Sequence, residues 1–341
     1  MRHSTIHLFQ AIAVFLAGTA MSAGAAPKPK PTPTPTASVT PTKTPTPAPT
    51  PTRTPTPTPT PVPPGSVSVT ITDPSPGASI SADRYNVRGT FQGPANTGVT
   101  VNDLIAYTAN GTFAVNGVSL VAGANHIVAT GMAANGQTAT TSTDVSATGT
   151  SADLVLNADI TSGIVPLSVT FTYQLRSNST INKLMIDFDG DGHDDVRTVK
   201  APTSVQNTYT RPGLYLATLT ITDNAGRTYK ANLAIDARTT DAADSLFHSV
   251  WDPMNAALAR GDVNAALIYL NARAREQYAP VFNELLSEMP AIVGSYSSPQ
   301  RVSIATDYLE YAVNRMIDGE DQIFFVYLLR DADGVWRMDS M

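Results

Sequence analysis

The most concentrated chemistry in the sequence is a nine-residue acidic stretch, DFDGDGHDD, that begins at Asp187. It holds five carboxylates, and like charges this close disfavour one another's ionisation. Asp187, Asp189 and Asp191 occupy positions one, three and five. Gly192 follows at position six and Asp195 at position nine, which is the ligand spacing of a calcium loop. We therefore predict one structural calcium ion (Ca2+) with four aspartate ligands: Asp187, Asp189, Asp191 and Asp195.

The alternative interpretation is an exposed turn whose acids are solvated by water. Thr198 stands at position twelve, where a calcium loop normally has a bidentate acid, and the expected flanking segments are strands rather than helices. His193 would be a lone nitrogen donor among aspartates, whereas zinc normally takes more nitrogen or sulfur ligands. The donor set favours calcium over zinc, with a structural rather than a catalytic role.

The remaining residue patterns do not predict catalysis. The sequence has five histidines, two of them within the first seven residues, and we expect His126 and His248 to be structural. There is no Ser-His-Asp order, phosphate-binding glycine loop or metalloprotease helix signature. Four residues near the C-terminus are candidate pocket groups: Tyr278, Tyr308, Tyr311 and Asp252. Their spacing does not require acid–base chemistry, so we predict no catalytic residues and leave the ligand-binding residues unassigned.

The N-terminal segment predicts export. Residues 1–25 combine Arg2, a short apolar run over residues 8–16 and a small-residue cleavage site, as a signal peptide does. The run is shorter than the roughly 20 apolar residues of a membrane span. Residues 26–65 are Thr/Pro-rich and predict an extended, disordered linker, because proline favours neither helix nor central strand. We expect a secreted, periplasmic or cell-surface location and no later transmembrane segment.

Cysteine and charge narrow the classes of partner. The chain has no cysteine, so it offers neither a disulfide nor a lipid-anchoring cysteine. All 28 acidic residues and 17 of the 22 basic ones follow the linker, which gives the later part a net charge of 17 − 28 = −11. That balance argues against a nucleic-acid partner, which selects a basic surface.

Residues 66–148 have the pattern of a β-sandwich. Short alternating runs such as residues 67–71 are separated by turn residues, including Asn110–Gly111, Asn116–Gly117 and Asn135–Gly136. Closely spaced short strands of this kind predict an immunoglobulin-like sandwich. With an early Pro-Gly turn and the segment LVAGAN at residues 120–125, the region resembles bacterial immunoglobulin-like surface modules.

Residues 152–237 repeat the β pattern with sharper motifs. An alternating, proline-led strand over residues 166–173 precedes the acidic stretch, and Tyr209 then precedes PGLYLATLTITD at residues 212–223. This ordered set resembles a PKD domain, although the family's tryptophan is missing at the central turn and extra aspartates replace its simple Phe-Gly-Asp-Gly. The resemblance implies an extracellular β-sandwich that acts as a spacer or binder.

Residues 241–341 have a different pattern, in which predicted helices come before predicted strands. Apolar residues recur every four positions between Leu246 and Leu258, which predicts an amphipathic helix that ends at Gly261. Asp262 can cap a second helix, and a third is expected over residues 280–289. Strands are expected over residues 307–316 and 322–329, followed by an Asp-Gly hairpin into residues 335–338. Helices followed by an antiparallel sheet are α+β, and the order resembles the cone-shaped nuclear transport factor-like (SnoaL-like) fold.

The expected architecture is therefore multidomain, with two all-β immunoglobulin-like sandwiches followed by an α+β cone-shaped domain, after a disordered Pro/Thr linker. We expect a non-catalytic exported or cell-surface protein that displays a C-terminal binding module. Its partner would be an extracellular protein, a glycan or a small apolar ligand. The alternative is an enzyme of the isomerase or hydrolase type with its pocket in the C-terminal domain. Convergent polar groups in a closed pocket would favour the enzyme.

Overall fold

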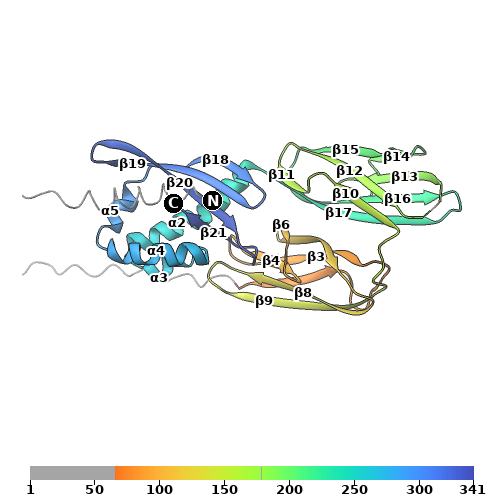
Figure 1. Cartoon of the computed structure of the whole chain (residues 1–341), viewed down its shortest axis with the longest axis horizontal. Helices are drawn as coiled ribbons and strands as arrows, with labels where there is room; N and C mark the ends of the chain where they lie inside the picture. The colour runs from red at the N-terminus through yellow and green to blue at the C-terminus, as the bar shows by residue number, and fades with distance from the viewer. Residues whose placement is uncertain (1–65, 178) are drawn as a thin grey trace, which may run out of the picture. The chain divides into compact units, whose positions relative to one another are not determined.

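The computed structural model describes residues 66–177 and 179–341 and is mostly β-strand, arranged in five sheets, with few helices (Figure 1). The chain divides into two units, Met1–Pro64 and Gly65–Met341. The predicted signal peptide (residues 1–25) and linker (residues 26–65) lie outside the described residues. None of the described helices is long and apolar enough to cross a membrane.

The first sandwich is built from the first nine strands, in two sheets with a shared core. One sheet has the order β1 (Ser68–Asp73), β3 (Arg84–Gln92), β7 (Thr112–Ser119) and β6 (Tyr107–Ala109). The other has the order β2 (Ser79–Ile80), β9 (Thr138–Ala147), β8 (Gly123–Met132), β4 (Gly98–Val101) and β5 (Leu104–Ile105). Phe113, Val87 and Ile127 are fully or almost fully buried between the sheets. Alternating inward residues from both sheets thus form one core, as the sequence pattern predicts.

Two of the predicted turns are confirmed and one is wrong. Asn110–Gly111 joins β6 to β7 and Asn135–Gly136 joins β8 to β9, with both glycines at positive φ. Asn116–Gly117, by contrast, lies inside β7, where the pairing with β3 shifts register and Gly117 has φ +73°. The pair forms a β-bulge, which uses the same left-handed glycine as a turn and re-aims the neighbouring side chain. The Asn116 amide bonds to Ala234, far along the chain, instead of facing a turn.

The second sandwich comes directly after the first. Its smaller sheet has the order β10 (Leu154–Ala158), β12 (Leu167–Leu175) and β15 (Ser204–Tyr209). The larger has the order β11 (Ser162–Ile164), β17 (Thr228–Arg238), β16 (Gly213–Asp223), β13 (Ile181–Asp187) and β14 (Val196–Thr198). Phe171, Leu219 and Ile235 are buried between them. The strands predicted at residues 166–173 and 212–223 are confirmed as β12 and β16.

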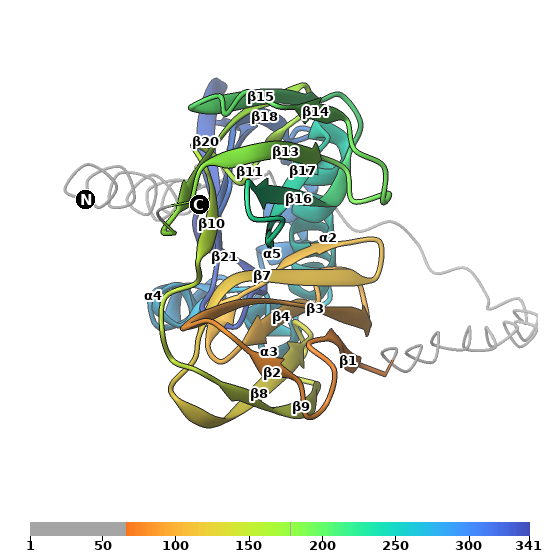
Figure 2. The same cartoon turned by 90° about the vertical axis from the view of Figure 1, so that its right-hand side faces the viewer.

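Strand β17 leaves part of one edge of this larger sheet open. It pairs with β16 from Thr228 to Ala237 but with β11 only at Asp236, Ala237 and Arg238. Its earlier residues therefore have outward backbone groups that no strand of their own sheet pairs. Strands β3 and β7 of the first sandwich contact β17. Figure 2 shows the second sandwich above the first in that view.

Four helices come next. They are α2 (Thr240–Ala259), α3 (Val263–Leu267), α4 (Ala272–Glu284) and α5 (Met289–Gly294). Side chains of Thr239, Asp262 and Asn271 cap the first three by accepting bonds from backbone N–H groups. The first helix and the Asp262 cap are confirmed. The prediction of a third helix over residues 280–289 is wrong in its bounds. Pro280 lies inside α4, not at a start, and the segment before Met289 separates two helices.

The chain ends in an antiparallel sheet of β18 (Gln300–Ala305), β19 (Tyr308–Ile317), β20 (Glu320–Arg330) and β21 (Trp336–Ser340), in that order. Strand β18 is not predicted by the sequence pattern, since five of its six residues are exposed. Phe247 and Met254 of α2, and Leu309, Val313 and Val326 of the sheet, are buried. Helix α2 contacts both β18 and β21, so the helices cover one face of the sheet.

Candidate functional site

The acidic stretch forms a loop between β13 and β14 that its own backbone organises. Gly190 N donates to Asp187 Oδ1 at 2.7 Å and Gly192 N donates to Asp187 Oδ2 at 2.9 Å. Phe188 N donates to Asp195 Oδ2 at 2.7 Å, which closes the loop. These amide bonds partly offset the negative charge, and they fix the direction of the carboxylates.

Three of the four predicted metal ligands converge. Carboxylate oxygens of Asp187, Asp189 and Asp195 all lie within 4.8 Å of one another. Asp191 lies outside this group, and its Oδ1 accepts from His193 N at 2.7 Å and lies 3.2 Å from His193 Nδ1. Of the four aspartates that the calcium-loop spacing selects, the structure therefore groups three and leaves Asp191 apart.

The donor set of this group fits calcium. All three residues offer hard carboxylate oxygens, which Ca²⁺ prefers, and the group contains no nitrogen or sulfur donor. Partial burial, together with the negative charges of the neighbouring aspartates, raises the pKa of Asp189. A group whose charged form is disfavoured in this way is stabilised by a bound cation. The three carboxylates Asp187, Asp189 and Asp195 are the ones that would hold it.

The candidate pocket groups near the C-terminus are engaged elsewhere. Tyr278 is buried, and its hydroxyl donates to Met341 O at 2.8 Å. Tyr311 stacks on Phe247 with ring centroids 3.8 Å apart, and its hydroxyl bonds to the Asp244 carboxylate. Burial and that carboxylate raise the pKa of Tyr311, so the hydroxyl is a poor base or nucleophile.

The other two candidates lie apart from these. Tyr308 packs beside Tyr327, with centroids 5.9 Å apart. Asp252 pairs with His248 one turn earlier on an exposed side of α2, at 3.1 Å. The four residues therefore do not form one constellation.

A second candidate site lies where the two sandwiches and the C-terminal region meet, and asparagine side chains hold this junction together. The Asn116 amide donates to Ala234 O and accepts from Ala234 N, both at 2.9 Å. Asn86 Nδ2 donates to Asn232 O at 2.6 Å, and Asn86 Oδ1 accepts from Gly117 N at 2.7 Å. Asn86 and Asn116 thus bond the outward backbone groups of β17 that its own sheet leaves open.

A matching amide pair joins the first sandwich to the C-terminal hairpin. Asn96 Nδ2 donates to Trp336 O and Asn96 Oδ1 accepts from Trp336 N, both at 2.8 Å. Asn96 has φ +63°, a conformation that asparagine tolerates better than most residues. A Cβ built on Gly98 would lie 2.3 Å from Gly334 C, so the two backbones touch without a side chain between them.

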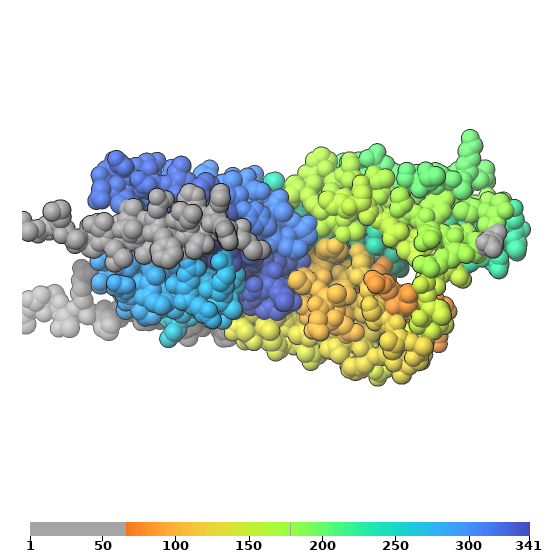
Figure 3. All heavy atoms as spheres, viewed as in Figure 1, coloured from red at the N-terminus to blue at the C-terminus, as the bar shows by residue number. Residues whose placement is uncertain are grey.

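Arg330 completes the junction from inside. Its guanidinium donates to Ala106 O of the first sandwich at 2.5 Å and to Gly334 O at 3.2 Å. Burial, and next the charge of Arg238, lower the pKa of Arg330 to about 10. Atoms of all three regions are in contact at this junction (Figure 3).

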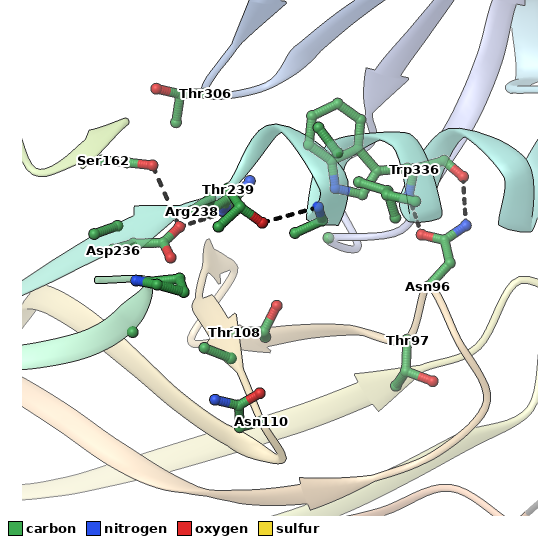
Figure 4. A pocket seen from close by; sticks show the side chains of 18 of the residues that line it. Asn96, Thr97, Thr108, Asn110, Ser162, Asp236, Arg238, Thr239, Thr306 and Trp336 are labelled. Carbon is green, nitrogen blue, oxygen red and sulfur yellow. Dashed lines mark hydrogen bonds and ion pairs between the residues drawn. The ribbon is translucent and has the colours of Figure 1, made fainter. Parts of the chain in front are cut away.

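Between these contacts lies a cavity of about 1010 Å³, which we call the junction cavity. Polar side chains from all three regions face it (Figure 4). The charged residues in its lining are Asp236 and Arg238, which pair with each other at 2.5 Å. Ser162 Oγ also donates to Asp236 Oδ2, at 3.3 Å, whereas Asp236 Oδ1 is buried and has no hydrogen-bond partner. A buried carboxylate oxygen without a donor is rare and costs free energy.

Sequence reasoning misses the junction cavity entirely. Asn96 and Trp336, which both line it, are 240 positions apart, and no short motif connects its residues. The one available signal for the junction around it is the Asn-Gly pair at residue 116, which the sequence pattern assigns to a turn. The alternative interpretation of this pair is a β-bulge inside an alternating strand, and it would identify Asn116 as a residue whose side chain makes a distant contact.

No protein-family model matches the chain, and no curated protein matches it either. Solved structures similar to parts of it include fibronectin(III)-like modules of Clostridium thermocellum CbhA, at 13% identity over 51% of this chain and 96% of that one, with a TM-score of 0.22. Another is the PKD1 domain of the Vibrio cholerae metalloprotease PrtV, at 24% identity over 25% of this chain and 95% of that one, with a TM-score of 0.20.

A third similar structure is SGBP-B of the Bacteroides ovatus mixed-linkage glucan utilization locus, in complex with a mixed-linkage heptasaccharide. It is 13% identical over 51% of this chain and 48% of that one, with a TM-score of 0.19. Likenesses at these TM-scores carry no argument about function. The β-sandwich character of the chain rests on its own strands and sheets.

Proposed function

We propose that this protein is a non-catalytic, exported or cell-surface binding protein. In this proposal residues 66–341 form one preorganised body, in which the second sandwich is of the PKD type and the C-terminal part is a nuclear transport factor-like module. The observation that carries the proposal is the junction, where Asn96 and Asn116 bond the first sandwich to the other two regions and all three regions line a shared cavity. Independent spacers need no such contacts.

The lining of the cavity favours binding over catalysis. General acid–base chemistry uses a group that is free to exchange a proton with the ligand. The ionisable residues lining the junction cavity, Asp236 and Arg238, already form an ion pair. The Tyr311–Asp244 contact, which would be the obvious pair for an enzyme, is stacked into the core on Phe247.

The same proposal includes one structural calcium ion on the acidic loop, held by Asp187, Asp189 and Asp195. It would neutralise the repulsion among these carboxylates and tie β13 to β14. The loop is preorganised by its own amide bonds, so calcium would find its ligands already placed. Its role is to stabilise the second sandwich, with no part in chemistry.

Calorimetric unfolding of the full chain tests whether the three regions act as one body. We expect residues 66–341 to unfold in a single transition. Asn96→Ala and Asn116→Ala each leave a backbone N–H and C=O without their partner, which costs about 1–3 kcal/mol. The double variant should show separate transitions. Separate transitions in the natural protein, unchanged in the double variant, would mean that the sandwiches are independent spacers and that the junction is not a built site.

A further inference from the structure

We propose that the junction cavity binds a neutral, short oligosaccharide through its hydroxyl groups. The inference rests on the proposed binding function and adds the class of ligand. It begins with Asp236, which is 0% exposed and lines the cavity with one oxygen unpartnered. Figure 4 shows this carboxylate bonded on one side, to Ser162 and Arg238. The other oxygen is itself buried, so a ligand donor reaches it only after the side chains around it move.

The charge balance of the cavity selects a neutral donor. Arg238 already compensates Asp236 at 2.5 Å, and the guanidinium of Arg330 lies close enough to both to feel their charges. A cationic ligand would therefore lie beside the Arg238 guanidinium, and an anionic one would lie beside the Asp236 carboxylate. A neutral O–H or N–H group avoids both penalties.

Other polar side chains in the lining are also available. Among the hydrogen bonds of the described residues, none involves the side chains of Thr108, Asn110 or Thr306, and all three line the cavity. They come from the first sandwich and from the turn between β18 and β19. Hydroxyl and amide groups both donate and accept, so they suit a ligand whose own groups do the same. A purely apolar ligand would desolvate these groups without replacing their bonds to water.

Apolar side chains complete the match. Phe91 and Ile160 also line the cavity, and Ile160 is 40% exposed. A sugar ring offers C–H faces to such side chains and hydroxyls at its edge to polar ones. The cavity volume of about 1010 Å³ is at the top of the range of about 300–1000 Å³ for ligand pockets. A ligand longer than one sugar ring fits this space.

The test is calorimetric titration of the full chain with four neutral trisaccharides: cellotriose, maltotriose, xylotriose and mannotriose. A Thr-Pro hexapeptide is the peptide arm. We expect at least one trisaccharide to bind with a Kd below 10 mM. Asp236→Asn keeps the shape of the side chain but exchanges an acceptor for a donor, and it should weaken that binding at least 10-fold.

A second variant guards against misfolding of the first. Asn110→Gly keeps the left-handed conformation of the turn (φ +49°) and removes a rim amide, so it should weaken binding about 3- to 10-fold. The matched control is Asp103→Gly, at φ +66° in an exposed turn that does not line the cavity, which should bind as the natural chain does.

Three results would overturn the inference: no trisaccharide binds, binding is unchanged in both cavity variants, or the hexapeptide binds in place of every sugar. The unfolding experiment on the same preparation separates this failure from failure of the proposed function. A single transition without sugar binding would leave the binding body intact and exclude only the ligand class.

Discussion

The acidic loop and the junction cavity each hold a buried aspartate of the second sandwich, and the two carboxylates are satisfied differently. Both oxygens of Asp187 accept backbone N–H groups from within five residues. Asp236 has one oxygen bonded and one without a partner, among groups contributed by distant parts of the chain. A local loop can satisfy its own charges, whereas an unfinished polar site at a junction points to a partner from outside.

The largest effect is expected from crowding the junction. Gly98→Ala adds a Cβ that would lie 2.3 Å from Gly334 C and 2.5 Å from Asp333 O, which forces the two backbones apart. Overpacking of this kind costs about 1–3 kcal/mol. Gly98 is not at positive φ, so alanine brings no backbone strain, and the three atoms nearest to the added Cβ all belong to the C-terminal hairpin. The melting temperature of the full chain measures the loss.

Gly294→Ala is the matched control for this substitution. A Cβ at Gly294 meets nothing within 4 Å, and its φ is also unstrained, so the melting temperature should stay nearly unchanged. Equal melting temperatures for the two alanine variants would show that Gly98 and Gly334 are not packed together.

The second prediction concerns how stability depends on pH, which should differ between an aspartate with a lowered pKa and one with a raised pKa. Burial alone would raise the pKa of Asp223, but bonds from Arg227, Ser179 and Ala225 outweigh it and lower the pKa to about 2. A lowered pKa stabilises the fold above the unfolded value of 3.8, and this contribution is lost as pH falls through about 2. We expect the natural chain to lose stability between pH 4 and pH 2, and Asp223→Asn to lose less over that interval.

In the acidic loop, the contribution of Asp189 to stability should change with pH in the opposite direction. The pKa of Asp189 is raised, so its contribution favours the fold at low pH and is lost as pH rises above 3.8 through the raised value. Asp189→Asn should remove that loss in the absence of calcium. A steeper loss on the alkaline side in this variant would contradict the assigned repulsion.

How far the sequence predicts each region depends on the same division between local and distant contacts. The grouping of Asp187, Asp189 and Asp195, the Asp262 cap, and the strands β12 and β16 were predictable, since each depends on residues close together in the chain. The bounds of α4 were not, because Pro280 is tolerated in its helix by tertiary context. The junction was not predictable at all, because Asn96 meets Trp336 only after two sandwiches have folded between them.

Calcium should give a smaller effect than the junction variants. Extracellular calcium modules bind with Kd on the order of 10⁻⁴–10⁻³ M, so 1 mM calcium adds ~0.4–1.4 kcal/mol. That is a rise in melting temperature of one to a few degrees, roughly. Asp189→Asn should reduce the rise, and magnesium should produce little, because it demands tighter octahedral geometry. Equal melting temperatures with calcium and with chelator would show that the loop binds no calcium and is an exposed turn whose acids are solvated by water.

The smallest expected effect is that of Asp191 on calcium binding, and it decides between the ligand set given by the sequence spacing and the one given by the structure. The spacing makes Asp191 a ligand, whereas the structure directs it to His193 and groups Asp187, Asp189 and Asp195 without it. We expect Asp191→Asn to keep most of the calcium response that Asp189→Asn loses. Loss of the calcium response in both variants would instead show that Asp191 is a ligand, as the sequence spacing predicts.

The most direct measurement for the junction is amide hydrogen exchange of Ala234 and Trp336 in the full chain, monitored by NMR. Each N–H donates to an asparagine of the first sandwich, at 2.9 Å and 2.8 Å, while Ile235 pairs within the ladder of β16 and β17. We predict that Ala234 and Trp336 are protected, and that Asn116→Ala abolishes protection at Ala234 while Ile235 remains protected. Exchange of Ala234 and Trp336 at the rate of open edge amides in the natural chain would contradict the account.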